Sequence, residues 1–149
     1  MKVIGIRCTK DQLHWVVLEG ATRADAVVLE HQEPKAPAGD RAEQLGWARK
    51  ELLEMLTRHT PVQVCLRVAE GGQNVAASLQ RAEMDGVVQA TVSERGIPVW
   101  RLYSATIRSA FSARKKVDLE AATAVVPCVA TSVKVRREQV VVAVAAFPA

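Results

Sequence analysis

The order of strand-like and helical segments constrains the fold of this chain more than any other feature of its sequence. Three short, apolar, β-rich runs come first, over residues 3–6, 13–18 and 26–29. Short polar loops join them, which is typical of an antiparallel meander. A loop rich in proline and glycine then follows over residues 33–39.

Beyond that loop, strands alternate with helices. Asp40 and Glu43 resemble a capping box, which predicts the start of a helix. The expected elements are helices over 41–58, 74–95, 104–111 and 117–126, the last one stopped by Pro127, with strands over 62–68 and 97–103. Residues 136–147 fit either a strand or a helix, because periodicity does not decide short apolar runs.

This order predicts an α/β fold in which a mixed sheet carries helices on both faces. A length of 149 residues is typical of one domain, expected here over residues 1–149. Gly86 lies inside the long helix, where glycine costs about 1 kcal/mol relative to alanine. We therefore expect Gly86 to allow close packing of that helix on the sheet.

The apolar runs are too short for a membrane protein. A bilayer-spanning helix needs about 20 apolar residues, and the longest run is 140–147. Arg7 interrupts the apolar start of the chain before a signal-peptide core could form. We expect a cytoplasmic protein that has no membrane partner.

Cysteine and histidine spacing does not suggest a metal centre. Cys8, Cys65 and Cys128 are far apart, and the histidines show no ligand spacing, whereas a structural zinc site needs about four clustered ligands. P-loop, dinucleotide-binding and nucleophile-elbow motifs are absent from the sequence. Ser104 is interpreted as a helix cap rather than a catalytic serine. We expect buried, reduced thiols, no metal, no cofactor and no catalytic residue.

Positive charge is concentrated in one part of the chain. The net charge is +4 overall. Between Arg101 and Arg137, however, eight basic residues stand against only Asp118 and Glu120. Such asymmetry can mark a surface for the phosphate backbone of DNA or RNA, although charge runs often form only a solvated face.

Three segments carry a resemblance to a known family. They are residues 1–6, the strand Val64–Arg67 followed by a glycine-containing loop and Asn74, and residues 96–108. In this order they resemble the RuvC-type Holliday-junction resolvases of the ribonuclease H-like superfamily. The chain is closer still to a small bacterial family of unknown function related to RuvC. The resemblance implies a ribonuclease H-like fold.

The metal-binding positions implied by the resemblance are altered. In the resolvases an aspartate follows Gly-Ile in the first strand, and Arg7 stands there. A glutamate precedes the asparagine by seven residues, and Arg67 stands there. The last helix brings two aspartates, and Glu138 is the only carboxylate in reach. Two-metal phosphodiester cleavage needs several converging carboxylates, so the resemblance implies a catalytically degenerate nuclease.

Two interpretations of these arginines stay open. In one, they bind nucleic-acid phosphate without cleaving it, because the guanidinium fork suits phosphate oxygens. In the other, Arg7, Arg67 and Glu138 form a structural ion cluster that replaces a lost metal site. The candidate nucleic-acid-binding residues are Arg7, Arg67, Arg101, Arg108, Arg114, Lys115 and Lys116. Glu70, Glu83 and Asp85 are expected to lie away from the cluster.

Two further classes of function are kept as alternatives. The chain could be a homodimeric protein-interaction module with no nucleic-acid ligand, if Trp47 and Met55 form an apolar surface patch rather than core. It could also be an enzyme acting on another small substrate, because one fold hosts many chemistries.

Overall fold

The fold is built on a five-stranded mixed sheet with the strand order β3-β2-β1-β4-β5. The computed structural model describes residues 1–71 and 75–149, and for residues 75–78 it describes the backbone alone. The strands are β1 (Lys2–Cys8), β2 (Leu13–Glu19), β3 (Val27–Gln32), β4 (Gln63–Arg67) and β5 (Val99–Leu102). β1 pairs antiparallel with β2, and β2 with β3, whereas β4 runs parallel to both β1 and β5. The predicted meander and mixed sheet are confirmed.

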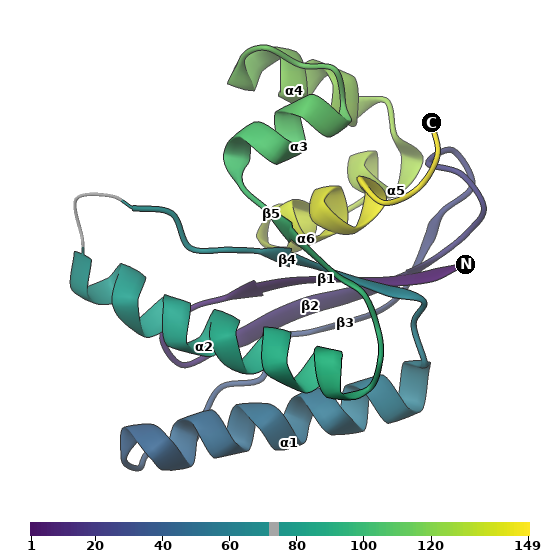
Figure 1. Cartoon of the computed structure of the whole chain (residues 1–149). Coiled ribbons are helices and arrows are strands. Elements are labelled where there is room, and N and C mark those ends of the chain that lie inside the picture. The colour runs from purple at the N-terminus through teal and green to yellow at the C-terminus, as the bar shows by residue number, and fades with distance from the viewer. Residues whose placement is uncertain (72–74) are drawn as a thin grey trace.

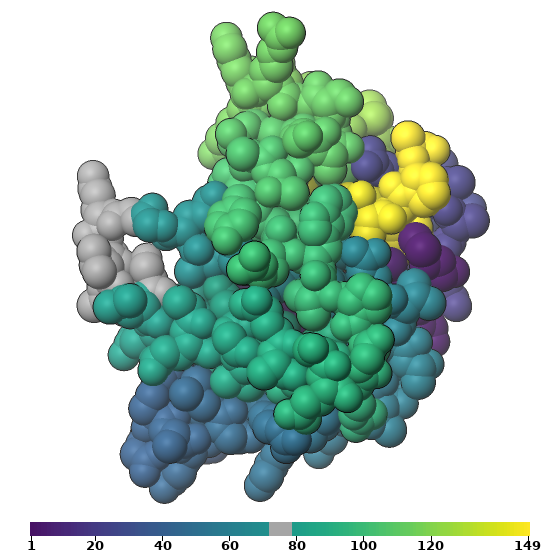
Figure 2. All heavy atoms as spheres, viewed as in Figure 1, coloured from purple at the N-terminus to yellow at the C-terminus, as the bar shows by residue number. Residues whose placement is uncertain are grey.

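Helices cover both faces of this sheet. Their bounds are α1 (Arg41–His59), α2 (Val75–Glu94), α3 (Ser104–Ala110), α4 (Lys116–Ala124), α5 (Pro127–Ala130) and α6 (Lys134–Val144). Figure 1 shows α1 and α2 on one side of the sheet and α3 to α6 on the other. In the space-filling view, α3 and α4 project beyond the teal surface of α2 (Figure 2). No helix in the described ranges is long and apolar enough to cross a membrane.

The ambiguous segment 136–147 is a helix as far as Val144, where α6 ends, and a turn beyond it. Alternate residues of β1 face opposite sides of the sheet, so Val3 joins the core beneath α6 and Ile4 joins the core beneath α1 and α2. The apolar side of α6, including Val140 and Val144, is fully buried against that first face. Tertiary burial on one side therefore determines the state of a segment whose own propensities are mixed.

Several local predictions are correct, and others need correction. The side chain of Asp40 caps α1 by accepting a hydrogen bond from the backbone N–H of Glu43. All three cysteines are free and buried, as expected. Pro127 does not only stop α4, because it is also the first residue of α5. A proline is well tolerated there, since the first N–H of a helix has no intrahelical partner.

The proposed apolar patch on α1 does not exist. Met55 is only 1% exposed and belongs to the core between α1, α2 and the sheet. Trp47 is partly buried and packs against the same core. The two side chains therefore stabilise the fold and do not form a surface patch for a partner.

Candidate nucleic-acid interface

The site is built where two parallel strands end side by side. In the register of β1 and β4, Arg7 is the direct partner of Arg67, so both side chains leave the same face of the sheet. That face is covered by α6, which places Glu138 between them. Arg7 Nε lies 3.2 Å from Glu138 Oε2, and Arg67 Nε lies 3.5 Å from Glu138 Oε1. The three positions singled out in the sequence are therefore one cluster.

Hydrogen bonds hold the guanidinium group of Arg67 in place. Its Nη1 donates to the carbonyl oxygens of Val68 and Leu102. Its Nη2 donates to Ser104 Oγ at 2.8 Å and to Glu70 Oε2 at 3.1 Å. The side chain is only 15% exposed. Arg67 is thus a fixed cation whose remaining free edge, Nε, faces Glu138.

Glu70 belongs to this cluster, contrary to the expectation that it lies outside. Its carboxylate accepts hydrogen bonds from the hydroxyl and the backbone N–H of Ser104. These hydrogen bonds, with that of Arg67, lower the pKa of Glu70. Ser104 is the first residue of α3 and not its cap, because Tyr103 holds the N-cap position. The carboxylate of Glu70 instead satisfies the free N–H at the start of the helix.

A second layer from α2 supports the arginines from behind. Arg81 Nη2 donates to the carbonyl oxygen of Arg67 at 2.8 Å. Asp85, which is 3% exposed, accepts the N–H of Ala69 at 2.7 Å, and burial raises its pKa. Burial and the neighbouring Asp85 raise the pKa of the Cys8 thiol well above its ordinary range. Asp85 therefore lies near the cluster, and only Glu83 is elsewhere, paired with Arg41.

Sequence reasoning missed Arg81 as a member of this layer. One signal was available, since Arg81 and Asp85 are four residues apart on a predicted helix and so share a face. Burial lowers the pKa of Arg81, and the nearby Arg7 adds to that effect. The site is thus a dense network of fixed charges of both signs.

The donor set does not fit a pair of divalent metal ions. Magnesium prefers hard oxygen ligands, chiefly carboxylates. One carboxylate, Glu138, stands between two guanidinium groups that repel a cation, and the carboxylate of Glu70 is already bound to Arg67 and Ser104. Within the described residues, no group of three or more histidine, cysteine, aspartate or glutamate side chains could hold a metal ion. The metal site of the resolvases is therefore not reproduced by these residues.

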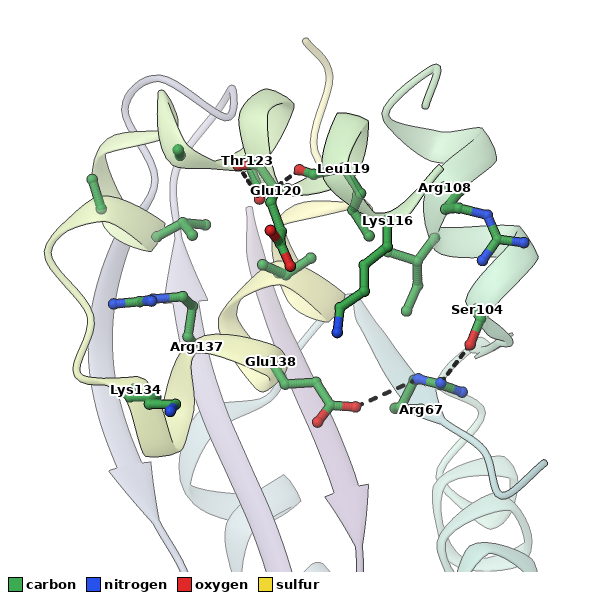
Figure 3. Close-up of a pocket in the computed structure, with 15 residues that line it drawn as sticks. Arg67, Ser104, Arg108, Lys116, Leu119, Glu120, Thr123, Lys134, Arg137 and Glu138 are labelled. Atoms are coloured by element: carbon green, nitrogen blue, oxygen red, sulfur yellow. Dashed lines mark hydrogen bonds and ion pairs between the residues drawn. The ribbon is translucent and has the colours of Figure 1, made fainter. Parts of the chain in front are cut away.

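A hollow of about 980 Å³ opens directly above the cluster. Figure 3 shows Arg67 and Glu138 at its floor, with Lys116 of α4 extending down toward them. Apolar side chains from α3 to α6, such as Ile107, Leu119 and Val141, form part of the wall. The basic residues that line it are Arg67, Arg108, Lys116, Lys134 and Arg137, against the acids Glu120 and Glu138.

The structure separates the basic residues proposed from the sequence. Arg67, Arg108 and Lys116 line the hollow, and Arg7 contacts its floor through Glu138. Arg114 and Lys115 are exposed beside it, just before α4. Arg101 is elsewhere, because its side chain lines a different hollow between α2 and β5. Lys134 and Arg137 were missed, since the sequence did not show that residues 134–144 form a helix facing the site.

Comparison with known proteins identifies the fold. RuvC of Thermus thermophilus superposes with a TM-score of 0.78 over 97% of this chain and 92% of that one, at 19% identity. The structure of that RuvC in complex with a Holliday junction substrate superposes with a TM-score of 0.76 over 97% of this chain and 91% of that one. A yeast mitochondrial Holliday junction resolvase is more distant, with a TM-score of 0.53 at 8% identity, covering 72% of this chain and 54% of that one.

Sequence similarity points the same way over part of the chain. The crossover junction endodeoxyribonuclease RuvC of Nitratidesulfovibrio vulgaris is 29% identical over 82 residues. That alignment covers 55% of this chain and about half, 49%, of that protein. No protein-family profile matches the chain. The chain thus has a ribonuclease H-like fold of the RuvC type, and its sequence is similar to a RuvC nuclease.

Proposed function

We propose that this chain binds nucleic acid through the phosphate backbone and does not cleave it. The observation that carries the proposal is the pair of adjacent arginines at the strand ends, Arg7 and Arg67, at positions where the resemblance to the resolvases implies metal-binding acids. A guanidinium group recognises phosphate oxygens directly. The hollow above the arginines presents further cations to a ligand.

The relatives support this choice of ligand class. One structure with the same fold is described as RuvC with a Holliday junction substrate. A DNA-binding protein of this fold can keep backbone contacts without metal ions, because phosphate contacts supply most non-specific affinity. The alternative, a protein-interaction module, relied on an apolar surface patch formed by Trp47 and Met55. Both side chains pack in or against the core, so this patch does not support it.

Fluorescence anisotropy with labelled four-way junction, duplex and single-stranded DNA, and with RNA, tests the proposal. We expect saturable binding that weakens steeply as salt rises, because each phosphate contact releases counterions. Addition of magnesium should yield no cleavage products. No binding of any of these probes, even at low salt, would contradict the proposal.

Two arginines provide a matched pair of variants for the same assay. Arg108→Gln removes a cation from the hollow, and Arg101→Gln removes the same charge from a different surface. We expect Arg108→Gln to weaken binding about 3–10-fold and to reduce the salt slope by about one contact. Equal effects of the two variants would indicate a general charge effect and no binding at this face.

A further inference from the structure

The carboxylate of Glu138 occupies the space between two guanidinium groups. Its two oxygens are divided between them, with Oε2 near Arg7 and Oε1 near Arg67, at 3.2 and 3.5 Å. A carboxylate held in this way imitates the two oxygens that a phosphate group would offer to the same pair of cations.

Arg67 is fixed by its neighbours, whereas Glu138 is not. Arg67 is bound to its neighbours through both terminal nitrogens, and Arg81 and Asp85 support the strand end behind it. Glu138 is 47% exposed, and the pair distances are long. Because nearly half of the Glu138 side chain is exposed, water can solvate its carboxylate when it moves aside, while Arg67 keeps its hydrogen bonds to Val68 and Ser104.

The location of Glu138 connects the arginine pair to the hollow. Figure 3 shows its carboxylate at the floor, linked to Arg67, with Lys116 above it. A phosphate group that entered the hollow would meet Lys116 and then the arginine pair. The carboxylate would have to move aside before the group could bind both arginines.

We propose that Arg7 and Arg67 form a subsite for one phosphate ester group of a nucleic-acid backbone, and that Glu138 fills this subsite in the free protein. The inference rests on the proposed function, because it needs a nucleic-acid ligand at this face. Binding then exchanges one anion for another, and the apparent affinity is reduced by the fraction of molecules in which Glu138 occupies the subsite.

Glu120 provides the control for this idea. It lines the same hollow and carries the same charge, and among the described residues its carboxylate forms no ion pair with Arg7 or Arg67. The experiment compares Glu138→Gln and Glu120→Gln by anisotropy with the same labelled DNA duplex over a range of salt. Glu138→Gln should bind about 5–10-fold more tightly than the unmodified protein, with a salt slope larger by about one or two contacts. Glu120→Gln should change the affinity less than about 2-fold.

The double variant Arg7→Gln/Glu138→Gln tests whether the gain requires the arginine. We expect most of the gain to disappear, because a coupled pair is not additive. Thermal unfolding of each variant verifies that it is folded, and Arg7→Met replaces Arg7→Gln if the latter is not.

The outcomes separate this inference from the proposed function. Equal tightening by Glu138→Gln and Glu120→Gln, or weaker binding by Glu138→Gln, would overturn the role of Glu138 while leaving nucleic-acid binding intact. Absence of binding by the unmodified protein and by every variant would overturn the proposed function itself.

Discussion

At the scale of single residues, Gly5 sets how closely α6 approaches the sheet. A Cβ atom on Gly5 would lie 2.9 Å from Ala143 Cβ and would collide with the carbonyl oxygen of Gln139. A glycine in a strand often marks such a close approach of another backbone. Glu138 is the residue before Gln139, so its position depends on Gly5 of β1 having no side chain.

We predict opposite effects from adding one methyl group at two glycines. Gly5→Ala should lower the free energy of unfolding by about 1–3 kcal/mol or more, because the contact is backbone and cannot yield. Gly86→Ala should raise it by about 0.5–1 kcal/mol, since a Cβ there meets no atom within 4 Å and helix propensity improves. Urea denaturation measures both.

The open space around Gly86 corrects the expectation that this residue allows close packing of α2 on the sheet. A lower free energy of unfolding in Gly86→Ala would contradict the finding that the space around Gly86 is open. A neutral Gly5→Ala would show that α6 can shift, and the placement of Glu138 would then be less constrained.

We predict that His14 makes the stability of the protein dependent on pH. It stands opposite Arg7 in β2, and its pKa is lowered from 6.5 by burial, an effect that Glu33 opposes and Arg7 reinforces. The unfolded chain therefore binds a proton at a higher pH than the folded protein does. The free energy of unfolding should fall as pH drops through 6.5 toward the lowered pKa.

Denaturant unfolding over this pH range, compared between the unmodified protein and His14→Gln, measures the effect. The free energies of unfolding of the two proteins should become more similar as the pH falls, because protonation of His14 then opposes folding. Parallel curves would show that His14 titrates alike in both states.

At the scale of elements, Arg23 ties the helical side of the molecule together. Its guanidinium group donates to the carbonyl oxygens of Ala110, Ala145 and Phe147, at the ends of α3 and α6. It also lies 4.2 Å from the centroid of the Phe111 ring. Free carbonyls at helix ends need partners, so one side chain from the loop between β2 and β3 joins two helices that wall the hollow.

We predict that Arg23→Met lowers the free energy of unfolding by about 1–3 kcal/mol, because it leaves these carbonyl oxygens without their donor. Arg49→Met is the control, since Arg49 forms a single exposed ion pair with Glu94 and should change stability by less than about 1 kcal/mol. Similar losses in both variants would contradict the role of Arg23. Denaturant unfolding measures the comparison.

The elements also show what could be read from the sequence. The strands and the first two helices were predictable, because long apolar periodicity and clear breaks surround them. In the pocket wall, α3 and α4 were predicted over 104–111 and 117–126, whereas α5 was not, since it has only four residues and begins at the proline expected to end α4. α6 was ambiguous because its β-branched residues favour a strand, and only contact with Gly5 and β1 makes the helix favourable.

At the scale of the whole molecule, the candidate site depends on contacts between distant parts of the chain. Counting residues from the resemblance selected Arg7, Arg67 and Glu138, which the structure brings together. The same residue counting did not predict that Glu70 and Asp85 lie beside this cluster or that Arg101 lies away from it. These positions depend on the paths of loops and on the rotation of helices. Those features come from tertiary packing and have no local signal in the sequence.

The proposed exchange of metal-binding acids for arginines predicts how metal binding could be restored. The double variant Arg7→Asp/Arg67→Glu would place three carboxylates around one point, counting Glu138. We expect magnesium or manganese to raise its melting temperature, by linkage, since the ion binds only the folded state. The unmodified protein should show no such increase.

A second double variant, Arg101→Asp/Arg114→Glu, carries the same change of charge on other surfaces and serves as the control. A similar response of this control would reflect weak ion binding to any acidic surface. The absence of a response in Arg7→Asp/Arg67→Glu would mean that the three carboxylates do not converge as the structure indicates.

The pairing of β1 with β4 has a consequence for the history of such a protein. The backbone hydrogen bonds of the sheet hold positions 7 and 67 next to each other, and no ion is needed to do so. A lineage can therefore exchange the chemistry at these two positions in a few mutational steps without having to invent a new way to fold. Under the proposed function, two substitutions at these positions turn a site for metal ions into a site for phosphate while the sheet stays intact.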